Sequence, residues 1–410
     1  MPMIPWHAVV RSFALFVLGL SCLAQDKPPP GKDDDEVQKL GPVDPYTGND
    51  AAAMQQAGVV AYGPFPWADH HSTTDVDRVL GEKRVLWLET AHFKLGSSLK
   101  STPWPENAEA RKFLEQEVKA LRKKLPKVPE KPKKLDPWLR LHLYAQRCEK
   151  AYADCQELLG VTDADFPARG QAPREGAFLG LPGKFLLLTF QKQSDMARYM
   201  DRFCNQKVDK SMRHYHDKTC QMLLAVAMEG LDGIDESGLH AHVLFATWQN
   251  LINGYNGFSY PLPLWFGEGL CHWYARKVPT EFLSVQIKDD EAVAEEKQHN
   301  WPVKVRRRAQ HEATCFKFDD MAEWAKWEDM GYHRHAQSWS RMDFLMQQDK
   351  QKVGLMLRQL KAVPPDNTFE GQAPVLRTLA KKLVVELFEL DGPAFDAKWR
   401  EWVLKTYPKK

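Results

Sequence analysis

The chain has 410 residues, of which 43% are hydrophobic and 11% aromatic, enough apolar material for a large core in one or two domains. Lysine and arginine number 56 against 54 aspartate and glutamate residues, so the formal net charge is only +2. This balance indicates neither nucleic acid nor an anionic membrane surface as a partner.

The first residues have the order of a secretory signal peptide. One arginine precedes an apolar run over residues 13–20, and small residues precede the expected cleavage point after Ala24. The run is too short for a membrane span, so we expect residues 1–24 to be removed and the protein to be exported, to the periplasm or the extracellular space. A lipid anchor at Cys22 is the weaker alternative, because Gly19 stands where such a signal needs leucine. No other stretch is apolar enough to suggest a membrane span.

Residues 25–80 are rich in proline, glycine and aspartate and have no sustained apolar period. This composition predicts a low-complexity linker, that is, a tether followed by poorly ordered polypeptide. The pair His70 and His71 near its end is then expected to be exposed. We therefore place the folded domain at residues 81–410.

The first half of this domain mixes strands and helices. The sequence predicts a strand over about residues 85–95, rich in β-branched and aromatic residues. Helices are expected over about 106–125 and 136–160, the second with an aspartate N-cap, a proline at its first position and a terminal glycine. A short apolar strand over 183–190 and a helix over 193–203 follow. This mixture without strict alternation indicates an α+β fold.

The second half of the domain is predominantly helical. Apolar residues at near-helical spacing place residues 239–252 on one helix, and a loop rich in glycine and proline leads to a second helix over 264–277. Residues 281–312 are charged and irregular, and helices are expected again over about 319–407. Residues 281–410 are therefore taken as the helical C-terminal part of the domain.

Six cysteines remain after removal of the signal peptide. An even number in an exported chain permits disulfides, and buried free thiols are the alternative. Cys148 and Cys155 lie seven residues apart on an expected helix, about 10 Å along its axis, so they should not bond each other. The other four are Cys204, Cys220, Cys271 and Cys315.

Two stretches carry the most specific chemistry, LHAHVLFATW at residues 239–248 and LPLWFGEGLCHWY at residues 262–274. A His-Glu-x-x-His helix binds zinc because residues four apart project from the same face, so that two imidazoles reach one metal. The glutamate beside the first histidine activates the metal-bound water, and a glutamate on a following helix can supply the third ligand. In this chain His242 would be the first ligand and Glu268 the third.

These residues give the chain its resemblance to the gluzincin zinc metallopeptidases, in particular to the peptidase MA-like domains of exported bacterial proteins. Looser similarity covers about residues 85–410 and includes HAQSWSRMDFL near residue 340. The resemblance implies a zincin-like α+β fold, with strands and helices first and a mostly helical half after them. The family pattern, His-Glu-x-x-His followed by Pro-x-Trp-x-x-Glu-Gly, is matched by His242, Pro263, Trp265, Glu268 and Gly269.

The departures from the family pattern concern the catalytic residues. In this alignment Val243 occupies the position of the general base and Ala246 that of the second histidine, and neither side chain can accept a proton or bind a metal. His272 stands where relatives carry a carboxylate, and His335 stands in place of a tyrosine. The resemblance therefore implies a gluzincin fold without gluzincin chemistry.

We accordingly expect an exported protein whose peptidase site has decayed, with no catalytic residue and no cofactor, and with a cleft that binds a peptide or another protein. His242 and Glu268 are the vestigial metal ligands in this hypothesis, and they are expected to lie close together. The alternative is an active zinc metallopeptidase that uses His242, Glu268 and a substitute ligand such as His272. A purely structural role in an envelope assembly is a third hypothesis.

Three pairs of histidines stand two residues apart. On a helix this spacing turns the two side chains about 200° away from each other, whereas on a strand it places them on one face. Exposed or hydrogen-bonded side chains are the favoured interpretation of each pair. The pairs are His240 with His242, His214 with His216, and His333 with His335.

The segment HEATC at residues 311–315 has the spacing of a zinc helix with cysteine as the last ligand. It lies in a charged stretch without an apolar stripe, and no Trp-x-x-Glu-Gly follows it. We expect no catalytic role for it.

Overall fold

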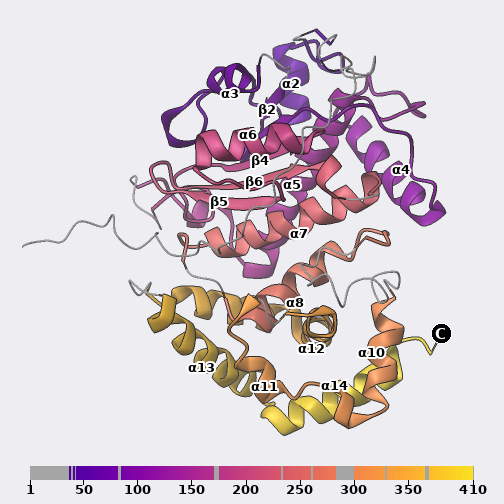
Figure 1. The fold of residues 1–410 in the computed structure, drawn as a ribbon, viewed down its shortest axis with the longest axis vertical. Helices are drawn as coiled ribbons and strands as arrows, with labels where there is room; N and C mark the ends of the chain where they lie inside the picture. Colours follow the sequence, from indigo (N-terminus) through magenta and orange to yellow (C-terminus); the bar gives the residue numbers. More distant parts are fainter. Residues whose placement is uncertain are drawn as a thin grey trace, which may run out of the picture. The chain divides into compact units, whose positions relative to one another are not determined.

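A six-stranded mixed sheet organises the first half of the protein and confirms the α+β class (Figure 1). Its strands lie in the order β1-β2-β3-β4-β6-β5. The first three pair antiparallel, β3, β4 and β6 pair parallel, and β5 forms an edge antiparallel to β6. The strands are Ala61–Tyr62 (β1), Leu86–Glu89 (β2), Phe93–Ser97 (β3), Phe185–Phe190 (β4), Met212–His216 (β5) and Gln221–Ala227 (β6).

The fold is that of a computed structural model. It describes residues 37, 40–41, 43–81, 85–169, 175–231, 234–259, 262–282, 300–327, 330–364 and 369–409, all of them within the unit Glu36–Lys410. The expected signal peptide and the start of the expected linker lie outside these residues. None of the helices in the described ranges is both long and apolar enough to cross a membrane.

Helices make up most of the remaining structure. In the first half they are α2 (Ala51–Ala57), α3 (Thr73–Val79), α4 (Ala108–Arg122), α5 (Pro137–Leu159), α6 (Gln193–Cys204) and α7 (Glu236–Gly254). In the second half they are α8 (Leu264–Ala275), α10 (Trp301–Ala309), α11 (Phe318–Ala322), α12 (Tyr332–Ala362), α13 (Phe369–Phe388) and α14 (Gly392–Thr406).

Helix α5 shows how closely local signals fixed some of these elements. The Asp136 side chain accepts a hydrogen bond from the Leu139 backbone N–H, proline takes the first helical position, and Gly160 ends the helix at φ 64°. Only glycine adopts this left-handed conformation at little cost. The helix expected over 136–160 is therefore confirmed to within a residue at each end.

Helices cover both faces of the central strands, which lie between α6 and α7 in Figure 1, and β4 and β6 are buried along their whole length. In β4, Phe185 and Leu187 belong to the core shared with α5 and α7, whereas Leu186 and Leu188 belong to the core under α6. Successive strand residues point to opposite faces, so a sheet covered on both sides has continuous apolar strands. The run FLLLTF satisfies this requirement, and so does QMLLAVA of β6, a strand that the sequence analysis did not predict.

The single strand expected over residues 85–95 is wrong, because β2 and β3 form a hairpin there. The Thr90 backbone N–H donates to the Phe93 carbonyl at 2.9 Å, which closes the turn. Glu149, on α5, accepts hydrogen bonds from the Thr90 hydroxyl and the His92 backbone N–H. The turn depends on a carboxylate far away in the sequence, so the apolar pattern alone could not reveal it.

Residues 43–80, assigned above to a linker, are folded instead. They form α2, β1 and α3, and Asp44 is fully buried against α5. Its carboxylate accepts hydrogen bonds from the hydroxyls of Thr47 and Tyr62 and lies 3.0 Å from His142 Nε2. Polar contacts with a buried carboxylate hold the start of this segment, and burial of Phe65, Trp67 and Val76 in the core under α6 holds the rest.

A buried ion-pair network fixes the start of α7. The Glu236 carboxylate lies 2.7 Å from Arg140 Nη2 and 2.9 Å from Arg147 Nη1, both on α5. Arg147 also pairs with Glu117 of α4 at 2.8 Å. Burial by itself would raise the pKa of Glu236, but the two guanidinium charges hold it below its ordinary value. The network therefore ties three helices together through charged groups that stay ionised.

Helices α8 and α12 approach each other unusually closely at Gly269. A Cβ atom at this position would lie 2.5 Å from the Ser338 carbonyl oxygen, closer than any real contact of this kind. Glycine is therefore required here for close approach of two backbones. This contact places α12 directly against the helix that carries Glu268.

Candidate functional site

Glu268, His272 and His335 form a buried cluster between α8 and α12. His335 Nδ1 lies 3.2 Å from Glu268 Oε2 and 3.2 Å from His272 Nε2, and the His272 Nε2 to Glu268 Oε2 distance is 3.8 Å. All three residues are only 2–3% exposed. The first two lie one turn apart on α8, as the sequence indicated, and the third comes from α12.

Helix α7 closes the cluster from the other side. Gln249 Nε2 donates a hydrogen bond to Glu268 Oε1 at 2.7 Å. One turn earlier, the Phe245 ring lies against the His272 ring, with 4.6 Å between the ring centroids. Positions 245 and 249 are therefore the ones on α7 that face Glu268 and His272.

His242 is not part of the cluster, so its expected contact with Glu268 is wrong. It lies two helical turns, about 10 Å along the axis, before Gln249, the α7 residue that binds Glu268. Its two ring nitrogens are buried and have no hydrogen-bond partner in the described part of the chain, and its ring faces Phe282 at 6.0 Å. Burial lowers the pKa of His242 to about 4, so the ring is neutral at physiological pH.

Val243 and Ala246, taken above as replacements for the base and the second ligand, are both buried in the core. The alignment of α7 with the His-Glu-x-x-His pattern placed the wrong residues opposite Glu268, because it took His242 as the first ligand. The contacts place a phenylalanine and a glutamine opposite Glu268 and His272, and nothing in the sequence marks these residue types as occupants of a site. The sequence feature that could have identified them is an antiparallel pairing of α7 with α8, in which position 249 lies opposite position 268 and position 245 lies opposite position 272.

Burial favours a neutral His272 ring in the cluster. It lowers the pKa of His272 well below its ordinary value, and the neighbouring His335 and Arg276 lower this pKa further. His335 Nε2 is buried without a hydrogen-bond partner among the described residues. A neutral His272 imidazole beside a carboxylate keeps a lone pair available, which is the state in which such a group binds a metal ion.

The spacing of the donor atoms is compatible with one metal ion. A tetrahedral zinc ion with bonds of about 2.0–2.1 Å separates its nitrogen and oxygen ligands by about 3.3 Å. The separations of 3.2, 3.2 and 3.8 Å in the cluster are near this value. The same distances also allow an internally hydrogen-bonded cluster, in which Gln249 donates to Glu268 and one histidine donates to the other.

A pocket of about 360 Å³ opens beside the cluster, and His272 lies in its wall. The pocket is framed by the facing ends of α7 and α8 and by the first residues of α4 and α10. Its wall combines charged, polar and apolar groups, so it suits a ligand of mixed polarity. Other residues in the wall are Asn107, Glu109, Ala241, Arg276, Phe282 and Asn300.

The remaining sequence candidates have structural roles or stand apart. In the HEATC segment only Glu312–Thr314 is helical, as a short 3-10 turn, so the segment cannot present ligands as a zinc helix does. His240 is buried near Glu117, 3.7 Å from its carboxylate. His70 is exposed as expected, whereas its neighbour His71 is half-buried against Phe203.

The cysteines settle the alternative left open above. None of the six forms a disulfide bond in the structure; five of them are buried and Cys315 is partly exposed. Buried free thiols are therefore the correct alternative, and no disulfide links the described cysteines. Cys148 and Cys155 are both buried on α5 and unbonded, as the helical spacing required.

Comparison of the chain with protein-family models, with curated proteins and with solved structures finds no match in any of the three.

Proposed function

We propose that this chain is an exported, inactive relative of the gluzincin metallopeptidases, which binds a peptide or a protein with a zincin-like fold and does not hydrolyse it. The observation that carries the proposal is the pair of α7 residues that face Glu268 and His272. In an active peptidase of this type, two histidines one turn apart would stand opposite the glutamate of the next helix. Here these two positions hold Phe245 and Gln249.

Neither side chain can replace an imidazole at a catalytic zinc ion. The phenyl ring of Phe245 has no lone pair to offer a metal ion. The side-chain amide of Gln249 donates its N–H to Glu268 Oε1 at 2.7 Å, so this carboxylate oxygen already accepts a hydrogen bond. Ala246 follows Phe245, at the place where the glutamate base would be. Loss of a general base alone costs on the order of 10²–10⁴ in rate. The residues at these positions do not fit a peptidase zinc ion.

Binding without hydrolysis is supported by the pocket beside His272. Its volume of about 360 Å³ accommodates a few residues of an extended chain, and its wall offers Glu109 and Arg276 as charged groups and Phe282 as an apolar one. Such a wall can recognise both the side chains and the backbone of a peptide.

A second candidate function is the active zinc metallopeptidase, with Glu268, His272 and His335 as the ligands in place of the set expected from the sequence. The donor distances of 3.2, 3.2 and 3.8 Å favour it. One carboxylate and two imidazoles make a donor set that zinc accepts, and it leaves a fourth position for water. His272 borders the pocket, so a substrate could approach this position.

One experiment separates the two candidates. The full chain is assayed with zinc for cleavage of denatured casein, and for binding of fluorescently labelled casein peptides by polarisation. The natural sequence, and each variant described below, is compared with the same chain carrying Glu268→Ala. Zinc bound at other sites then contributes equally to both and cancels in the difference. We expect the natural sequence to bind the peptides and to show no zinc-dependent cleavage that requires Glu268.

Introducing zinc ligands into α7 tests which positions of this helix face Glu268. In the triple variant Phe245→His, Ala246→Glu and Gln249→His, two imidazoles face Glu268, so the variant should bind one more zinc ion than its Glu268→Ala counterpart. The matched control is Ala246→His, which creates the spacing with His242 and should gain no Glu268-dependent zinc. Cleavage by the natural sequence that is lost with Glu268→Ala would overturn the proposal in favour of the second candidate. A folded triple variant without additional zinc would contradict the assigned register.

A further inference from the structure

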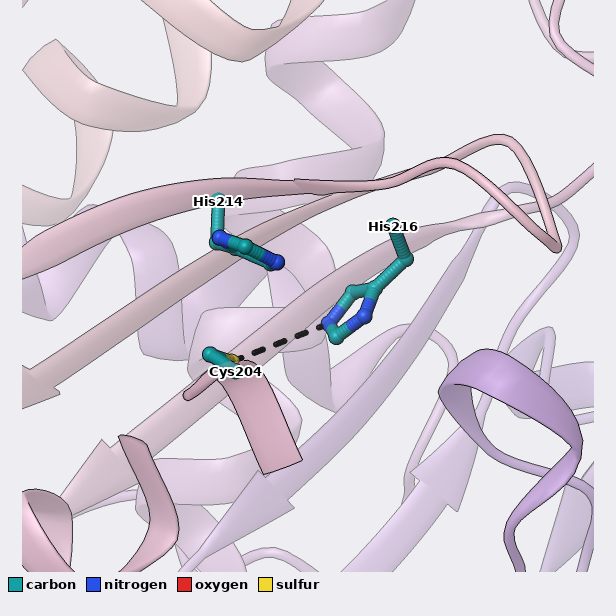
Figure 2. Close-up of side chains that lie close together, drawn as sticks. All are labelled: Cys204, His214 and His216. Carbon is teal, nitrogen blue, oxygen red and sulfur yellow. Dashed lines mark hydrogen bonds between the residues drawn. The ribbon is translucent and has the colours of Figure 1, made fainter. Parts of the chain in front are cut away.

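Cys204, His214 and His216 form a second cluster of metal-ligating side chains, on the face of the sheet that α6 covers (Figure 2). The two histidines stand two residues apart on β5 and therefore point to the same face. Arg213, which directly precedes His214, points to the other face, where its Nη1 donates to Asn250 Oδ1 of α7 at 3.4 Å. Cys204 is the last residue of α6 and lies beneath both rings.

The three donor atoms converge. They all lie within 4.8 Å of one another, and Cys204 Sγ is 4.0 Å from His216 Nε2. The two imidazole rings meet edge to face, with centroids 4.7 Å apart. A tetrahedral zinc ion with bonds of about 2.3 Å to sulfur and 2.0–2.1 Å to nitrogen separates these ligands by about 3.3–3.6 Å. Small side-chain rotations therefore suffice to bring all three onto one ion.

Asp69 orients one ligand in the manner of known metal centres. Its Oδ2 lies 2.9 Å from His216 Nδ1, so Nδ1 carries the proton and the Nε2 lone pair faces Cys204. Asp69 adopts φ 51°, and the next residue, His70, adopts φ 67°. Non-glycine residues take left-handed conformations at a cost, which the surrounding structure must compensate. The backbone is held in this conformation where it delivers the carboxylate to the histidine.

A different use of the same groups, as a Cys-His-Asp nucleophile, fits less well. Cys204 and His216 are 6% and 1% exposed, so a substrate cannot reach the sulfur without unpacking α6. Burial, together with the nearby Asp69 carboxylate, raises the pKa of the Cys204 thiol to about 12, whereas a cysteine nucleophile needs a lowered pKa.

We propose that Cys204, His214 and His216 bind one zinc ion, with Asp69 as the positioning residue and a solvent molecule at the fourth position. Binding converts the Cys204 thiol to a thiolate and releases one proton to solvent. The ion joins the end of α6 to β5, the edge strand of the sheet. This site is separate from the cluster at Glu268 and does not depend on the function proposed for that cluster.

The test uses cobalt as the probe, because a thiolate bound to Co²⁺ gives a near-ultraviolet charge-transfer band that carboxylate and imidazole ligands do not give. The full chain is treated with a chelator and titrated with Co²⁺ and then with Zn²⁺. One equivalent of Co²⁺ should give the band, and Zn²⁺ should abolish it by displacement. Asp69→Asn should lower the zinc affinity by about 10–100-fold, the range found when the partner of a metal-bound histidine is removed.

Matched variants assign the ligands. Cys204→Ala should lose the band, and His214→Gln should weaken metal binding without unfolding the protein, since this side chain is only half-buried. Cys155→Ala removes another buried thiol and Glu268→Gln alters the other cluster, so both should keep the band. A band that persists in Cys204→Ala would overturn the proposal, and so would the absence of the band when circular dichroism shows an intact fold.

Discussion

The close contact between α8 and α12 makes a sharp prediction, because two glycines on α8 differ in the space around them. A Cβ atom at Gly269 would meet the Ser338 carbonyl oxygen at 2.5 Å and Met342 Cβ at 3.1 Å, whereas one at Gly267 would meet nothing closer than Leu262 Cβ at 3.6 Å. Alanine gains about 0.5–1 kcal/mol over glycine within a helix at either position. The difference between the two variants therefore isolates the cost of overpacking.

Overpacking of a well-packed interior costs about 1–3 kcal/mol, and a backbone oxygen cannot rotate away as a side chain can. The alanine variant at position 269 should thus be less stable than that at position 267 by this amount. The unfolding entropy is about 2.1 cal/mol/K per residue, so for a unit of about 375 residues the two melting temperatures should differ by roughly 1–4 °C. Gly267→Ala itself should melt at or slightly above the parent.

Chemical denaturation monitored by circular dichroism measures the free energies directly, and calorimetry measures the melting temperatures. Gly269→Ala should also push α12 away from α8 and so lengthen the contact between His335 and Glu268, which histidine NMR signals report. Equal stabilities for the two alanine variants would refute the reasoning, since they would mean that α12 does not approach α8 at Gly269.

Two further predictions concern buried charged and titratable groups. Glu236→Gln leaves two buried guanidinium groups without their shared carboxylate and should cost about 3–5 kcal/mol in urea denaturation, whereas Glu157→Gln, whose partner is at the surface, should change stability by less than about 1 kcal/mol. Equal losses would refute the network. Burial lowers the pKa of His242 to about 4 and that of His240 well below its ordinary value. Between these pKa values and about 6.5 the unfolded chain binds more protons than the folded chain, so the free energy of unfolding should fall as pH drops from about 6.5 towards 4. The slope should reach up to about 1.4 kcal/mol per pH unit for each histidine. The variant His242→Gln should have a smaller slope. A stability that is flat between pH 7 and 5 would contradict the assignment.

Some features of the fold were predictable because they depend on neighbours in the sequence. The N-cap, proline and terminal glycine of α5 act within one or two turns, and they located that helix to within a residue. The spacing of Glu268 and His272 likewise placed them on one face of α8, because residues four apart on a helix are neighbours. Continuous apolar runs identified β4, since a strand buried on both faces needs no polar alternation.

Other features were decided by tertiary structure. The axial position of α7 against α8 follows from how the two helices pack, and it brought Phe245 and Gln249, instead of His242, to the cluster. His335 lies 63 residues after His272 and reaches it only because Gly269 lets α12 approach.

Contacts between distant segments also account for the two features that the sequence analysis did not anticipate, the folded segment around Asp44 and the cluster at Cys204. The Asp44 carboxylate is buried among partners 2 to 98 residues away, so composition alone suggested a linker where the chain is folded. Cys204 lies close to His216 because β5 pairs with β6 at the edge of the sheet, over the end of α6. No periodicity in either segment predicts this contact between the two side chains. The sequence by itself determined several helices, among them α4, α5 and α8, the apolar strand β4 and the placing of Glu268 and His272 on one helix face, all of which arise from local spacing. Only the tertiary structure decided which side chains from different elements converge, because that depends on how whole helices and strands pack against one another.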